Sequence, residues 1–239
     1  MPSTLDRTSL PAFTEAIAAH ELSPGSHEPR SYPGYPRLSL PRAAPRLWPS
    51  LDRALQARRS PAELGRVLPS RRALGRLLSM AHGITAPGGR GPSPSAGGLQ
   101  ALEVFLAPLE LGWIDPGAYH YDRVGHHLSR VAEGLDRAAW ADAAPSLALT
   151  EGGALLVVLV GDLSRVERKY TRRAERFLLI EAGHVMQCLA LVGSSIDLGL
   201  LPIGGLIERD AHRALALDRG DVVLYAALVG SPPRRSASP

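Results

Sequence analysis

The sequence contains a single lysine, Lys169, although 27 of its 239 residues are lysine or arginine. Tyr170 follows it directly. A desolvated lysine can lose its proton near neutral pH whereas arginine cannot, so this pair could exchange protons with a substrate. The lysine could equally be a solvated charge at the start of a helix, because charged side chains on helix surfaces commonly point to water. Composition alone leaves both interpretations open.

Three short segments carry groups that suit a phosphate or a flat ring. Arg58, Arg59 and Ser60 offer two guanidinium groups and a hydroxyl where a short helix ends, and such groups bind phosphate. The other two segments offer small side chains and accessible backbone amides. They are Pro94, Ser95, Ala96 and Gly97, followed later by Pro202, Ile203, Gly204 and Gly205. Taken singly, each of the three segments could also be an ordinary turn.

Several classes of function are disfavoured by what the sequence lacks. It has no glycine-rich dinucleotide or P-loop motif, no HExxH or CxxC pattern, and no GxSxG. His126 and His127 have no spaced carboxylate partner, so we expect a solvated turn and no metal site there. The net charge of +4 comes from arginines dispersed along the chain, which gives no basic patch for nucleic acid.

The central feature of the chain is a long apolar helix. We predict it from Val166 to Val192, with Gly193 as its C-terminal cap. From Phe177 onward it is apolar on nearly every side, which predicts burial in a core or in a subunit interface. Further helices are predicted over 51–58, 62–83 (split at 69–70, where Ser70 can cap the second half), 135–143 and 209–217, and strands over 104–106, 118–121, 127–131, 154–161, 200–203 and 222–229.

Composition also suggests an organisation and a compartment. Residues 1–47 are rich in proline, serine and arginine and are expected to form an extended arm, and residues 48–239 to form one domain. The only cysteine, Cys188, allows no internal disulfide, which suits a reducing cytoplasm. The N-terminal sequence lacks the layout of a signal peptide, and polar residues interrupt the long helix, so we expect no membrane span.

The order of these segments resembles a known family. Arg-Arg-Ser at 58–60 is followed by Pro-Ser-Ala-Gly at 94–97, Lys-Tyr at 169–170, Ala-Gly-His-x-x-Gln at 182–187 and Pro-Ile-Gly-Gly at 202–205. Over about residues 50 to 235 this resembles the SagB-type dehydrogenases of the FMN-dependent nitroreductase superfamily. The resemblance implies an α+β nitroreductase-like fold, with a mostly antiparallel central sheet flanked by helices and a long buried helix at a homodimer interface.

The resemblance also implies a site for FMN between two subunits. Arg58, Arg59 and Ser60 would hold its phosphate and ribityl chain, joined by Arg234 or Arg235 from the C-terminal tail. The segment from Pro94 to Gly97 would line the flavin ring. The backbone from Pro202 to Gly205 would approach flavin N5. Lys169 and Tyr170 would take a proton from the substrate.

The function implied in this way is the oxidation of thiazoline or oxazoline rings in a ribosomally made precursor peptide to azoles, together with a cyclodehydratase. Two other functions remain open. One is an oxidoreductase of the same fold that uses NAD(P)H on a small molecule or a quinone. The other is a peptide-binding partner subunit without redox chemistry. The chain departs from the family pattern at Ala62, at Gln100 and Ala101 where Tyr-Pro is usual, and at Cys188.

Overall fold

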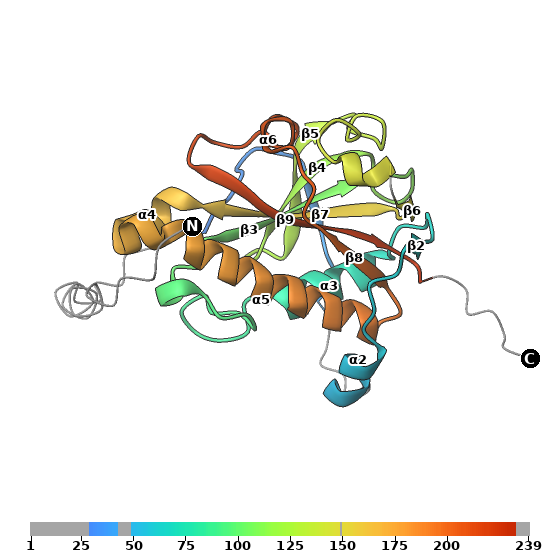
Figure 1. Ribbon diagram of the computed structural model, residues 1–239, viewed down its shortest axis with the longest axis horizontal. Coiled ribbons are helices and arrows are strands. Elements are labelled where there is room, and N and C mark those ends of the chain that lie inside the picture. Colours follow the sequence, from blue (N-terminus) through green and yellow to red (C-terminus); the bar gives the residue numbers. More distant parts are fainter. Residues whose placement is uncertain (1–28, 43–48, 149, 233–239) are drawn as a thin grey trace, which may run out of the picture.

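A seven-stranded sheet forms the centre of the molecule (Figure 1). The computed structural model describes residues 29–42, 49–148 and 150–232. The strand order is β1-β5-β4-β3-β7-β9-β8, and each neighbouring pair is antiparallel. The strands are β1 (Arg37–Ser39), β3 (Leu102–Pro108), β4 (Gly117–Asp122), β5 (His127–Glu133), β7 (Leu155–Asp162), β8 (Gly199–Ile203) and β9 (Asp221–Gly230).

The sheet separates two apolar layers. On one face, Leu102, Val104 and Leu106 of β3 pack with α3 (Arg71–His82) and α5 (Ala174–Ser195). On the other face, Phe105 and Ala107 pack with α6 (Glu208–Ala214) and the segment 135–148. Because side chains alternate between the faces of a strand, the apolar runs of β3 and β7 are buried on both sides. The predicted α+β fold with a mostly antiparallel sheet flanked by helices is confirmed.

Several local predictions are confirmed. Ser70 caps α3, since its hydroxyl accepts a hydrogen bond from the backbone N–H of Ala73. The predicted hairpin is β4–β5, and its turn is fixed by Asp122, whose Oδ1 accepts from the N–H groups of Val124 and Gly125 at 2.8 Å each. The helix predicted over 51–58 is α2 (Leu51–Ala57). These features rest on neighbours in the sequence, and local rules therefore found them.

The long helix is not continuous. It is divided into α4 (Leu163–Tyr170), a 3-10 turn η3 (Thr171–Arg173) and α5, and the break lies at Thr171, whose φ is 48°. A left-handed residue cannot continue a right-handed helix, so α4 and α5 take different directions. The predicted cap at Gly193 is also wrong. Gly193 lies inside the last turn, and its carbonyl accepts from Ile196 and Leu198 at 3.0 Å each.

Two further predicted helices are absent. Glu63 and Leu64 form the short strand β2, which pairs in parallel with β6 (Glu151–Gly152). The stretch between Pro61 and Pro69 is too short to nucleate a helix by itself, so sheet pairing prevails. Residues 135–143 form turns, followed by the 3-10 helix η2 (Pro145–Ala148), although Trp140 is fully buried within them.

Only one face of α5 is buried within a single chain. Leu178, Val185 and Leu189 lie in the core, whereas Leu179 and Ile180 are 51% and 49% exposed. By length and composition alone, the segment Leu163–Ser195 could cross a membrane, with a mean hydropathy of 1.5 in its most apolar window. A core helix passes the same test, and α5 packs on the sheet. The exposed apolar face is compatible with the predicted subunit interface, which stays a prediction.

Candidate active site

The loop before β3 meets the end of α4 at Gly97. This residue belongs to the short 3-10 helix η1 (Ala96–Gly98) and has a φ of 58°. A Cβ atom placed on Gly97 would lie 2.5 Å from the Tyr170 hydroxyl and 2.6 Å from Lys169 Nζ. A side chain there would displace the ends of both side chains, because such atoms do not approach within 3 Å of each other. The structure therefore brings Pro94–Gly97 and the Lys169–Tyr170 pair together.

The Lys169 and Tyr170 side chains lie close to each other. The ammonium nitrogen of Lys169 is 5.6 Å from the centre of the Tyr170 ring, and that ring packs against Phe177 at a centroid distance of 4.5 Å. Both residues are half-buried, and burial raises the pKa of the Tyr170 phenol. Tyr170 therefore stays a neutral hydrogen-bond donor at physiological pH, next to the side-chain nitrogen of Lys169.

A third residue of this region, Glu181, was not singled out as a site residue by its sequence. It lies in α5 and is 3% exposed, and its Oε2 accepts a hydrogen bond from Ala96 N–H at 3.1 Å. Burial raises the pKa of this carboxyl, and hydrogen bonds from Ala96 and Ser95 partly oppose the rise. Ser95 Oγ in turn accepts from Gln100 N–H at 2.8 Å. Glu181 thus holds the loop against α5. A lone carboxylate in an apolar helical run was the signal for it.

Gly97, Lys169 and Tyr170 form the first cluster of predicted site residues. The second cluster, Arg58, Arg59 and Ser60, lies where α2 ends. Arg58 Nη1 is 3.3 Å from Ser60 Oγ, and Arg59 Nη1 donates to the carbonyls of Gln56 and Arg58 at 2.7 and 2.8 Å. Arg59 lines a cleft of about 680 Å³ together with Ser194 of α5 and with Gly199 and Leu200 at the start of β8. The cleft is open, and its charged lining residues are Arg53, Arg59 and Asp197, so an excess of positive charge allows it to accept an anionic group.

Strand β8 runs from this cleft to the Pro202–Gly205 segment. Pro202 and Ile203 are the last residues of β8, and the two glycines follow. Gly204 is exposed, and a Cβ placed on it would meet no atom within 4 Å. Gly205 is held by Ser146, whose hydroxyl donates to its carbonyl at 3.2 Å. The segment thus presents accessible backbone, as predicted from its composition. Arg234 and Arg235 lie outside the described residues.

The two clusters lie towards opposite ends of α5. The first is joined to the helix at Glu181, and the second at Ser194, whose hydroxyl donates to the Ala54 carbonyl of α2 at 3.4 Å. Thirteen residues separate these two contacts, which is about 20 Å along a helix. Figure 1 shows α4 at one end of α5 and α2 at the other. One chain therefore does not bring Lys169 together with Arg59.

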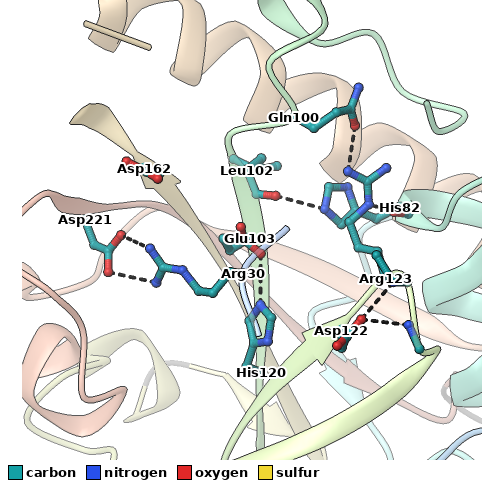
Figure 2. A network of polar contacts seen from close by, with 12 residues as sticks. Arg30, His82, Gln100, Leu102, Glu103, His120, Asp122, Arg123, Asp162 and Asp221 are labelled. Atoms are coloured by element: carbon teal, nitrogen blue, oxygen red, sulfur yellow. Dashed lines mark hydrogen bonds and ion pairs between the residues drawn. The ribbon is translucent and has the colours of Figure 1, made fainter. Parts of the chain in front are cut away.

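A network of polar side chains connects strands of the sheet beside the first cluster (Figure 2). Glu103 and His120 are both nearly fully buried, and His120 Nε2 lies 2.9 Å from Glu103 Oε2. Arg30 forms a two-point ion pair with Asp221. Burial would lower the pKa of the Arg30 guanidinium, but the bonds to Asp221 outweigh it, so the pKa is raised. Arg30 and Asp221 are 191 positions apart, and no motif in the sequence pointed to their pairing.

Metal binding finds no support in the described residues, where no group of three or more His, Cys, Asp or Glu side chains could hold an ion. The expectation of a solvated turn at His126 is wrong. His126 is 3% exposed, and its two ring nitrogens lie 2.9 Å from the Tyr121 hydroxyl and 3.1 Å from the Pro41 carbonyl. The segment 29–42, which is packed on the hairpin, supplies this cover.

Sequence comparison identifies a relative of similar length. The Methanocaldococcus jannaschii protein MJ1384, named as a nitroreductase, is 25% identical over 174 residues, which is 73% of this chain and 88% of the relative.

Solved structures share the fold at lower identity. A protein from Ralstonia eutropha, also named as a nitroreductase, is 22% identical with a TM-score of 0.72, covering 87% of this chain and 95% of that one. A chain of the E. coli microcin synthetase McbBCD complex, solved with truncated pro-MccB17 bound, is 22% identical with a TM-score of 0.63, covering 97% and 84%. A Desulfovibrio desulfuricans protein solved with FMN is 18% identical with a TM-score of 0.52, covering 79% and 90%.

The family model agrees with these comparisons. The model described as the nitroreductase family matches residues 55–231, which include the loop at Gly97, the Lys169–Tyr170 pair and the end of β8. The chain belongs to the nitroreductase family.

Proposed function

We propose that this protein is an FMN-dependent dehydrogenase that oxidises thiazoline or oxazoline rings of a precursor peptide to azoles. The observation that carries the proposal is the meeting of Lys169, Tyr170 and Gly97, because it gives the only lysine of the chain a place against the loop expected to face the flavin. The likeness to a chain of a microcin synthetase complex, solved with a precursor peptide bound, adds support.

The chemistry assigns a distinct task to each group. Aromatisation of the ring removes one hydride and one proton from neighbouring ring atoms. Bound FMN would accept the hydride. Lys169, in its neutral form, would accept the proton, and the Tyr170 hydroxyl would donate a hydrogen bond to the peptide or to Lys169. Gly97 lets both side-chain ends reach the same spot, since a side chain there would displace them.

The residues of the second cluster fit the cofactor. Arg59 lines a cleft whose arginines outnumber its one carboxylate, Asp197, and Arg58 and Ser60 lie beside it, which suits the phosphate. The open backbone at Gly204 suits the close approach of a flat ring. Arg234 and Arg235 are proposed to contact the same phosphate. A purified protein that is yellow, with a flavin released on denaturation, would support this assignment, and a colourless protein that takes up no FMN would count against it.

A homodimer would complete the site. The two clusters of one chain lie about 20 Å apart along α5, and α5 exposes Leu179 and Ile180 on its free face. A twofold axis across this face would place the Arg59 cluster of one subunit near the Lys169 cluster of the other. Each site would then need both subunits.

Mixing inactive variants tests this arrangement. Arg59→Ala and Lys169→Ala chains, unfolded together and refolded in equal amounts, should regain about one quarter of the activity, because half of the dimers would carry one intact site of two. The matched control is the double variant on one chain, refolded with an equal amount of wild type. Its mixed dimers contain no intact site, so only the wild-type homodimers, about one quarter of the dimers, should be active. No recovery from the two single variants, with about half of the activity kept in the control, would place all catalytic groups within one subunit.

The reaction itself is tested with an azoline-bearing peptide. Mass spectrometry should detect the loss of two hydrogens with the wild type. Lys169→Ala should keep the flavin and lose this conversion, while Arg168→Ala, which alters the exposed neighbouring residue, should retain it. Unchanged turnover by Lys169→Ala would remove the catalytic role. A cyclodehydratase that supplies the azoline is the partner this reaction requires.

A second function is favoured by the higher structural similarity to the Ralstonia eutropha protein named as a nitroreductase. The same fold would then pass hydride from NAD(P)H to a small molecule or a quinone. Rapid bleaching of the flavin by NAD(P)H, with no change in the azoline peptide, would favour it. A colourless protein that still binds the peptide would instead indicate a partner subunit without redox chemistry.

A further inference from the structure

A small cavity with three arginines in its walls lies beside the loop that carries Gly97. Its volume is about 150 Å³. We call it the arginine pocket, and its polar walls are Arg30, Arg123, Arg165, Glu103 and Gln100. Figure 2 shows Arg123 reaching from the hairpin turn towards Gln100, with Glu103 and Arg30 to their left in the view. A cavity of this volume holds a ligand of about benzene size.

Two of the three arginines have acidic partners. Arg30 is paired with Asp221, and Arg165 Nε donates to Asp162 at 3.1 Å. Arg165 Nη2 also lies 3.8 Å from Glu103 Oε1, and Glu103 itself is bonded to His120. The acidic partners Asp221 and Asp162 do not line the cavity, so its walls present three guanidinium groups and one carboxylate.

Arg123 differs from the other two. Among the described residues no carboxylate oxygen lies within 4 Å of its guanidinium; it donates to Gln100 Oε1 at 2.6 Å and to the carbonyls of His82 and Gly89 at 2.7 and 3.2 Å. Burial lowers the pKa of this group, which is the direction expected of a charge short of compensation. A partly buried cation without an adjacent carboxylate is costly, and an anionic group on a ligand would offset that cost.

Gln100 holds one wall of the arginine pocket in place before a ligand binds. Its φ is 50°, a left-handed conformation that non-glycine residues seldom adopt. Its side chain accepts from Arg123, its backbone carbonyl accepts from Arg165 Nη1 at 2.9 Å, and its N–H donates to Ser95. One residue thus orients two of the guanidinium groups. Backbone strain that the surroundings maintain is common at ligand sites.

We propose that the arginine pocket binds a free α-amino acid with a small apolar side chain, of the size of alanine or valine. Its carboxylate would face Arg123 and its ammonium would face Glu103. The charges support a zwitterion: Arg30, Arg123 and Arg165 are balanced by Asp221, Asp162 and Glu103, so a ligand without net charge leaves the region neutral. Ile84, Leu99 and Val124 supply an apolar wall for the side chain.

Isothermal titration of the full-length protein tests the proposal and needs neither flavin nor turnover. L-Alanine or L-valine should bind saturably. Propionate lacks the ammonium and alaninamide lacks the carboxylate, so both should bind about tenfold more weakly or worse. Inorganic phosphate should not compete. If no amino acid binds, if phosphate displaces a bound amino acid, or if propionate binds more tightly than alanine and valine, the proposal fails.

Two variants locate the binding. Arg123→Gln should weaken amino-acid binding about tenfold or more, because it removes the charge opposite the carboxylate. Val124→Trp alters an exposed side chain of the hairpin turn and should block the pocket without touching the charges, so it decides the matter if Arg123→Gln does not fold. Arg209→Gln, an exposed arginine outside the pocket, is the control and should bind as wild type does. Binding that survives Val124→Trp would place the ligand elsewhere.

Discussion

Gly97 and Lys169 lie against each other, since a Cβ on Gly97 would stand 2.6 Å from Lys169 Nζ. The loop before β3 and the last turn of α4 are distant in the sequence, and their contact defines a site at one end of α5. An absent side chain in the loop thus decides where the ammonium group of the only lysine can lie.

Substituting alanine at Gly97 should displace the Lys169 side chain. Both glycines of the loop have positive φ, 58° at Gly97 and 71° at Gly98, so either alanine variant should lose about 1 kcal/mol of stability. Only the Cβ of Gly97→Ala would also contact Lys169 and Tyr170, because a Cβ on Gly98 would lie within 4 Å of no atom. Protein labelled with ¹³C-lysine should show a single set of side-chain signals, which moves in Gly97→Ala and stays in Gly98→Ala. Identical spectra of the two variants would contradict the contact.

Glu181→Gln should change how stability depends on pH. Burial raises the folded-state pKa of Glu181 above the reference value of 4.5. The favourable contribution of its protonated form is therefore complete below pH 4.5 and is lost as the pH rises through the folded-state pKa. Glutamine keeps an acceptor for Ala96 N–H without the charge. The free energy of unfolding of the variant should therefore rise relative to that of the wild type as the pH increases. Urea unfolding across this range measures the difference. Glu175→Gln, an exposed site on the same helix, should show no such trend.

His82 should contribute to acid unfolding. Its ring is buried, with Nε2 3.0 Å from the Leu102 carbonyl, and burial lowers its pKa from 6.5 to about 3. Because the folded-state pKa is depressed, the stability from neutral His82 is present above pH 6.5 and is lost as the pH falls towards 3. The slope from this group approaches about 1.4 kcal/mol per pH unit. His82→Gln should make the acid limb of the stability profile shallower, whereas His184→Gln, at an exposed position, should leave it unchanged.

The ion pair between Arg30 and Asp221 should hold the segment 29–42 on the sheet. The side chains are 14% and 2% exposed, so Arg30→Met leaves a buried carboxylate and should cost about 3 kcal/mol. Adding Asp221→Asn should recover part of this loss, because the unpaired charge is then removed. Arg209→Met breaks an exposed pair with Asp210 and should change stability little. A loss in Arg30→Met no larger than in Arg209→Met would show that the pair does not anchor the segment.

The sequence predicted the features that depend on neighbouring residues. The apolar runs of β7 and β9, the Ser70 cap of α3 and the β4–β5 hairpin follow local rules, and their spacing was sufficient to find them. The fold was predicted from the resemblance of several short motifs to those of a known family. Predictions failed where a local pattern competed with long-range packing. Glu63 and Leu64, within the predicted helix, pair with β6, and Thr171 interrupts a segment predicted as one helix.

Only the tertiary structure decided how the chemistry-bearing residues are grouped. Ala96 and Glu181 are separated by 85 positions and meet because α5 crosses the sheet beside the loop. Likewise, Arg30 reaches Asp221 across 191 positions, and Arg123 meets Gln100 because β4 of the hairpin pairs with β3. The energy of such contacts depends on burial and on the order of strands, which spacing along the chain does not encode. The sequence therefore named Lys169 and Arg59, and packing decided that they lie towards opposite ends of one helix.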